Sequence, residues 1–151
     1  MAIYLVQHGL SLPKEDDPSR GLSPEGISDV ERIAGVAKGY GVRVEGIVHS
    51  GKKRALQTAE IFRAALSPTN GLRQEQGLAP MDEVTALAKR LDSQGNIMYV
   101  GHLPFMERLT SLLVADNQEL RVFKFQNGGI VCLDQQQGNW SITWTLMPNI
   151  G

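Results

Sequence analysis

The sequence predicts an α/β fold with three layers, in which a mostly parallel sheet is flanked by helices on both faces. Strand-like apolar runs alternate with amphipathic helical segments along the first two thirds of the chain, an order typical of parallel sheets. Three of the apolar runs end abruptly in polar residues. The last third carries two further strand-like runs separated by QQQGN, which predicts antiparallel strands at the C-terminal end.

The chain opens with a predicted central strand. Residues 1–6 are apolar nearly throughout and include β-branched and aromatic side chains, which favours a strand covered on both faces. The following LSLPKEDDPSRG predicts an exposed loop. Ser23 and Pro24 then provide an N-cap and a first-turn proline for a helix that ends at Gly39. Its apolar positions follow helical spacing: Ile27, Val30, Ala34 and Ala37.

The middle of the chain repeats this alternation of strand and helix. Apolar periodicity and the positions of proline define each segment. The expected elements are a strand at 45–50, a helix with Ala55, Ala59, Phe62 and Leu66 on its apolar face, a short strand at 71–76, a helix at 81–91, a strand at 97–100 and a helix that begins at Pro104. The final strands are expected at 130–134 and 140–147.

Composition limits the classes of function. The chain has 151 residues, with 15 Lys and Arg against 16 Asp and Glu, so its charge of −1 predicts no nucleic-acid partner. Cys132 is the single cysteine, which excludes an intrachain disulfide and fits a reducing cytoplasm. No basic leader and no apolar run near the roughly 20 residues of a membrane span are present. We therefore expect a cytoplasmic protein without membrane contact, folded as a single domain over 1–151.

All three histidines fall where predicted strands end. The segments are Gln7-His8-Gly9, His49-Ser50-Gly51 and Gly101-His102. In open α/β sheets, ligands bind outside the carboxyl ends of the strands. The spacing offers no HxH or HxxxH pair and no acidic partner, so we expect no metal ion.

These segments carry the residue types that phosphoryl transfer needs. A neutral imidazole is a competent nucleophile toward phosphorus, and His8 is the candidate. Gly9, which has no Cβ, would let the backbone approach a ligand closely. Arg54 lies at the start of the second predicted helix, where free N–H groups also favour an anion, and its guanidinium can hold phosphate with two hydrogen bonds. Protonated His102 would add a donor from the opposite side.

Four motifs in order resemble the histidine phosphatase superfamily, which has the phosphoglycerate mutase-like fold. They are QHG near the N-terminus, LSPEG, SGKKRALQTAEIF and VGHLP. An LxP element at 78–80 and the stretch from Trp144 to Pro148 extend the resemblance over most of the chain. The short length and RGLSPEG are similar to the small phosphohistidine phosphatases of the SixA type.

The resemblance implies a role for each matching residue. His8 would become phosphorylated, Arg54 would clamp the phosphate, and His102 would stabilise the transition state. Arg20, in RGLSPEG, would also point at the phosphate. Gln7 and Gly9 would complete the phosphate-binding residues. The implied substrate is phosphohistidine on a protein, and the reaction needs no cofactor.

Gln7 is the main departure, because the family has arginine there. Charge-assisted hydrogen bonds contribute about 1.5 to 3 kcal/mol and neutral ones roughly 0.5 to 1.5. The loss would slow the reaction about tenfold to a few hundredfold, and it would let the pKa of His8 rise. Arg20, Arg54 or a neighbouring lysine is expected to supply part of the missing charge. A second departure is Gly51, where the family has proline.

The general acid is the second open point. Asp82 and Glu83 are the nearest carboxylates in the sequence to the expected site, although acidic pairs in a first helical turn commonly complement the helix dipole. A phosphohistidine substrate relaxes the requirement, since a protonated imidazole leaves as a neutral group. Two alternatives stay open: a catalytically weak phosphate-binding or regulatory relative, favoured by Gln7, and a phosphatase for a small phosphorylated molecule.

Overall fold

The computed structural model describes residues 1–150, which form one six-stranded sheet with the strand order β3-β2-β4-β1-β5-β6. The strands are β1 (Ile3–Gln7), β2 (Gly46–His49), β3 (Leu72–Gln74), β4 (Ile97–Gly101), β5 (Ile130–Gln136) and β6 (Asn139–Leu146). The helices are α1 (Pro24–Gly39), α2 (Lys53–Leu66), α3 (Val84–Arg90) and α4 (Phe105–Ala115), with a 3-10 turn at Ser93–Gly95. None of the helices in residues 1–150 is long and apolar enough to cross a membrane.

The first four strands of this order run parallel, and β5 and β6 complete the sheet antiparallel to their neighbours. Gln7 on β1 lies beside Gly101 on β4, and His49 on β2 lies beside Val100 on β4. The three polar segments that follow these strands therefore leave the sheet at the same edge. The predicted α/β class, with antiparallel strands at the C-terminal end, is confirmed.

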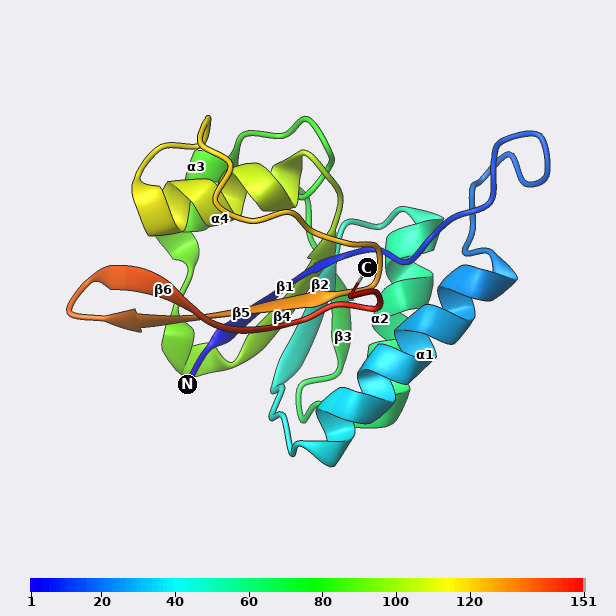
Figure 1. Cartoon of the computed structure of the whole chain (residues 1–151), viewed down its shortest axis with the longest axis horizontal. Helices are drawn as coiled ribbons and strands as arrows, with labels where there is room; N and C mark the ends of the chain where they lie inside the picture. Colours follow the sequence, from blue (N-terminus) through cyan, green and yellow to red (C-terminus); the bar gives the residue numbers. More distant parts are fainter. Residues whose placement is uncertain (151) are drawn as a thin grey trace.

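Helices cover both faces of the sheet. Figure 1 shows α1 and α2 on one side of the strands and α3 and α4 on the other. Alternate residues of β1 enter the two cores: Tyr4 and Val6 pack with α1 and α2, whereas Ile3 and Leu5 pack with α3 and α4. This alternation follows from the period of two along a strand. It explains why β1 is apolar at every position.

Helix α1 begins as predicted but buries a slightly different face. The Ser23 hydroxyl accepts a hydrogen bond from the Gly26 N–H at 3.0 Å, and Pro24 is the first helical residue. Ile27 is 38% exposed, while Ile33 is buried. At about 100° per residue, Ile27 lies at the margin of the buried stripe. The position before it is Gly26, whose Cα packs directly against the backbone of Leu10.

Two predicted boundaries were wrong for local reasons. Helix α3 begins at Val84 instead of Met81, because the Asp82 carboxylate accepts a hydrogen bond from the Ala79 N–H at 2.9 Å and holds a tight turn there. The QQQGN stretch is mostly strand, and only Gln137 and Gly138 form the hairpin loop. Both have positive φ, at 53° and 81°, as a two-residue hairpin loop of type I′ requires.

The contact between Gly26 and Leu10 gives a stability prediction. A Cβ at position 26 would lie 2.1 Å from the Leu10 carbonyl oxygen, whereas a Cβ at Gly35 in the same helix meets nothing within 4 Å. We expect Gly26→Ala to lower the free energy of unfolding by about 1–3 kcal/mol and Gly35→Ala to raise it by about 0.5–1 kcal/mol. Urea unfolding of the two variants measures both changes. Equal effects would contradict this account of the loop and helix packing.

Candidate functional site

Two histidines meet at the carboxyl edge of the sheet. His8 follows β1 and His102 follows β4, and their ring centroids are 5.1 Å apart with the planes tilted by 55°. The hydroxyl of Ser50, which follows β2, lies 2.6 Å from Nε2 of His102. Parallel register brings these side chains together from three parts of the chain that are far apart in sequence.

His8 is held in a defined ring orientation. Its Nδ1 lies 2.7 Å from the carbonyl oxygen of Gly9, and since a carbonyl can only accept, Nδ1 carries the hydrogen. Its backbone N–H donates to the Gly101 carbonyl at 2.9 Å. This tautomer leaves the lone pair of Nε2 free, as a nucleophile requires.

His8 is neutral at pH 7. Burial lowers the pKa of His8 to about 4; the bond to Gly9 opposes this effect, and the positive charges of Arg54 and Arg20 add to it. The two arginines therefore lower the pKa of His8 although Gln7 stands at the motif arginine position.

His102 is neutral as well. Burial lowers the pKa of His102 to about 3, with smaller contributions from His8, Arg54 and Lys52. His102 is therefore not a protonated donor in the free site at pH 7. The Nδ1 atom of His102 is buried and has no hydrogen-bond partner among residues 1–150. One ring nitrogen still carries a hydrogen, so the ring keeps one donor for an incoming oxygen.

Arg20 and Arg54 supply the positive charge of the site. Each arginine lies close enough to His8 to lower the pKa of His8. Burial lowers the pKa of Arg54, and the charge of Arg20 lowers it further. The Arg20 guanidinium donates to the Ser11 hydroxyl at 3.3 Å, while its Nε is buried without a partner. Neither arginine forms an ion pair within residues 1–150. Cations that no carboxylate neutralises favour an anionic ligand.

The start of α2 follows Gly51, which stands where the family motif has proline. Gly51 has a φ of +95°, which proline cannot adopt. Lys52 precedes the helix without a side-chain cap, and its charge reaches His102. Lys53 instead pairs with Asp17 at 2.9 Å. Of the two lysines, only Lys52 is available to add charge to the site.

Gly9 has a packing role in addition to the ligand approach expected from the sequence. A Cβ there would lie 2.7 Å from Cγ2 of Val30 on α1 and 3.2 Å from Cδ2 of Leu22. The missing side chain therefore allows α1 to approach the turn after β1. Gln7, at the end of β1, is half-buried, and its Oε1 atom has no partner among the described residues.

The two candidate carboxylates, Asp82 and Glu83, line a cavity of about 490 Å³ that Ser50 shares with them. Asp82 also accepts a hydrogen bond from Ala79, and Glu83, whose side chain is 71% exposed, lies 3.8 Å from Arg108. Ser50 connects this cavity to His102.

His49 takes part in local structure. It is buried, and its Nδ1 accepts a hydrogen bond from the Gly51 N–H at 3.1 Å. Burial lowers the pKa of His49, with an opposing contribution from Glu60. Its ring supports the loop between β2 and α2.

The sequence analysis missed Thr58 and Asn127. Thr58 accepts a hydrogen bond from the Gly9 N–H at 2.9 Å, and the Asn127 amide donates to the His8 carbonyl at 3.0 Å. Thr58 lies within the motif QTA, which was a usable signal. Asn127 lies in a turn before β5, and no pattern in the sequence marks it.

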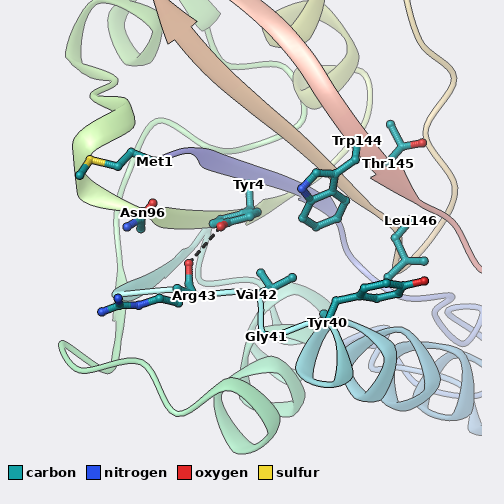
Figure 2. Close-up of a pocket in the computed structure, with 11 residues that line it drawn as sticks. Met1, Tyr4, Tyr40, Gly41, Val42, Arg43, Asn96, Trp144, Thr145 and Leu146 are labelled. Carbon is teal, nitrogen blue, oxygen red and sulfur yellow. Dashed lines mark hydrogen bonds between the residues drawn. The ribbon is translucent and has the colours of Figure 1, made fainter.

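The largest cavity described, about 750 Å³, lies away from the histidines. It sits near the opposite end of the sheet, because Tyr4 is near the start of β1 and Asn96 precedes β4. Figure 2 shows Tyr4, Tyr40 and Trp144 around it, with the Tyr4 hydroxyl bonded to the Arg43 carbonyl. Within residues 1–150, no group of three or more His, Cys, Asp or Glu side chains is arranged to hold a metal ion.

Comparisons with known proteins extend over the whole chain. No protein-family model matches. An uncharacterized protein of Picosynechococcus sp. is 33% identical over 113 residues, which cover 69% of this chain and 67% of that protein. Phosphohistidine phosphatase SixA of Escherichia coli (strain K12) is 25% identical over 98% of this chain and 94% of its own. A solved structure of the protein histidine phosphatase SixA complexed with tungstate has a TM-score of 0.84 at 23% identity and covers 98% of this chain and 97% of that chain. The expected phosphoglycerate mutase-like fold is confirmed.

The low pKa of His8 predicts a pH dependence of stability. Between pH 6.5 and about 4, the unfolded chain binds a proton at His8 that the folded protein does not bind, so stability falls as the pH falls. We expect His8 to contribute a loss of about 2 kcal/mol between pH 7 and pH 5. Urea unfolding at both pH values, compared with His8→Asn, measures this contribution. An identical pH dependence in the variant would contradict the low pKa.

Proposed function

We propose that this chain, whose sequence motifs and fold resemble those of the histidine phosphatase superfamily, hydrolyses phosphohistidine on a cytoplasmic protein through a phosphoenzyme at His8. The observation that carries the proposal is the ring orientation of His8. Its Nδ1 bonds to the Gly9 carbonyl, its Nε2 is free, and His102 lies 5.1 Å away, measured between ring centroids.

The reaction has two steps. The Nε2 lone pair of His8 attacks phosphorus and forms a P–N bond, while the bond from phosphorus to the substrate nitrogen breaks and its electron pair leaves with that nitrogen. Water then attacks the phosphoenzyme, which releases inorganic phosphate and restores neutral His8. Arg20, Arg54 and His102 hold the phosphoryl oxygens, because positioning and positive charge are the main requirements of this chemistry.

The leaving group favours a P–N bond. A protonated imidazole of the substrate leaves as a neutral molecule, so the first step needs no general acid. An alkoxide would need one, and Asp82 and Glu83 are the nearest candidates, in the cavity beside Ser50. Asp82 is occupied by its bond to Ala79, and Glu83 is mostly exposed. These features support a phosphohistidine substrate over a phosphate ester.

Gln7 favours the second candidate function, a phosphate-binding or regulatory protein with little turnover. Glutamine in place of arginine at this position is expected to slow the reaction about tenfold to a few hundredfold, because neutral hydrogen bonds are weaker than charge-assisted ones. Against this alternative, burial keeps His8 neutral, and the charges of Arg54 and Arg20 add to this effect, so the nucleophile stays available without a cation at position 7. A third candidate, hydrolysis of a small phosphate ester, lacks a well-placed acid.

The direct test compares the wild type with His8→Ala and Gln7→Arg on a phosphohistidine peptide. We expect turnover by the wild type, a loss of at least about a thousandfold in His8→Ala, and a gain of about tenfold to a few hundredfold in Gln7→Arg. Release of inorganic phosphate measures all three rates. Activity in Gln7→Arg alone would identify the natural protein as a binding or regulatory relative.

A second test concerns the general acid. If imidazole leaves already protonated, the combined variant Asp82→Asn with Glu83→Gln should keep the rate on the phosphohistidine peptide within about threefold. General acid catalysis typically contributes about 10² to 10⁴ in rate. Steady-state rates on the peptide and on an alkyl phosphate measure the contrast. A hundredfold loss on the peptide would show that a carboxylate protonates the leaving group and would contradict the proposed step.

A further inference from the structure

The peptide unit that joins His8 to Gly9 is clamped from both sides. Its N–H donates to the Thr58 hydroxyl oxygen at 2.9 Å, and its carbonyl accepts from the Asn127 amide at 3.0 Å. Thr58 lies on α2, and Asn127 lies in the turn before β5. Two segments far from β1 in sequence thus fix the orientation of one peptide plane.

Thr58 also connects this peptide unit to the helix that carries Arg54. Its side chain is completely buried, and its hydroxyl donates to the carbonyl of Arg54 at 2.8 Å. Since a hydroxyl has one hydrogen, that donation leaves its oxygen to accept the Gly9 N–H. One buried hydroxyl therefore connects the backbone of Gly9, next to His8, to the backbone of Arg54.

The clamped unit determines where the next carbonyl lies. The Gly9 carbonyl accepts the hydrogen of His8 Nδ1, and that bond selects the tautomer. The fixed plane sets the position of the Gly9 Cα, so the Gly9 carbonyl is built from a defined starting point although glycine itself has wide backbone freedom. The bond from the Gly128 N–H to the Gln7 carbonyl, at 2.8 Å, holds the same turn one residue earlier.

We propose, on the basis of the function proposed above, that Thr58 and Asn127 are positioning residues that keep the Gly9 carbonyl on Nδ1 of His8 and so keep Nε2 free to attack. Neither contacts the phosphoryl group. Removal of outer-shell groups that orient a metal-ligating histidine commonly lowers metal affinity or activity by about 10- to 100-fold, and we expect an effect of that size for residues that hold the turn of a nucleophilic histidine.

The experiment uses a matched control in the same protein. Thr110 on α4 is also completely buried and donates to the carbonyl four residues earlier, that of Met106, at 2.8 Å, but it does not contact the His8 turn. Thr58→Val and Thr110→Val therefore lose the same type of helical hydrogen bond. Thr58→Ser restores the hydroxyl, and Asn127→Ala removes the second side of the clamp.

We expect Thr58→Val and Asn127→Ala to lower the rate of phosphoenzyme formation by about 10- to 100-fold, with KM within about threefold of the wild type. Thr58→Ser should recover the rate to within about threefold, and Thr110→Val should leave it unchanged. In ¹⁵N NMR of the histidine rings, the wild type should show His8 with hydrogen on Nδ1, and the two clamp variants should show a mixture of tautomers.

Three results would overturn the proposal. The first is a wild-type tautomer and rate in both clamp variants. The second is an equal loss in Thr58→Val and Thr110→Val, which would indicate a purely structural effect. The third is a loss in Thr58→Val that Thr58→Ser does not repair. If the wild type fails to hydrolyse phosphohistidine, the proposed function fails, and the NMR tautomers still decide the positioning claim.

Discussion

The parallel register of β1, β4 and β2 is the constraint on which the candidate site depends. Gln7 lies beside Gly101, and Val100 lies beside His49, so the segments after three strands leave the sheet at one edge. A shift of one residue would send these side chains to the other face, because the side-chain period of a strand is two. The two apolar cores fix the register, since each face of β1 is buried.

The site combines neutral imidazoles with positive charges that no carboxylate within residues 1–150 neutralises. Burial keeps His8 and His102 uncharged, while Arg20 and Arg54 repel any further proton on His8. The free protein carries the electrostatic cost of keeping these cations side by side. A phosphoryl group would offset that cost, since it brings negative charge and acceptor oxygens to donors that lack partners.

Much of the fold followed from local sequence patterns. The apolar runs of β1 and β4 and the N-cap of α1 depend on neighbouring residues, so periodicity and motifs predicted them. Thr58 lies 49 positions from Gly9 in the sequence, and Asn127 lies 119 positions from His8. No local pattern carries information about contacts between residues so far apart. The packing role of Gly9 could not be predicted for the same reason, because the side chain it accommodates belongs to Val30 on another element.

The most direct measurement of the central claim is the site of phosphorylation. Wild-type protein is mixed with a phosphohistidine peptide at neutral pH, stopped rapidly and analysed by mass spectrometry under conditions that preserve P–N bonds, with ³¹P NMR to identify the substituted nitrogen. The account predicts a transient phosphoryl group on Nε2 of His8. A phosphoryl group on His102, or peptide hydrolysis with no phosphoenzyme at any time, would contradict it.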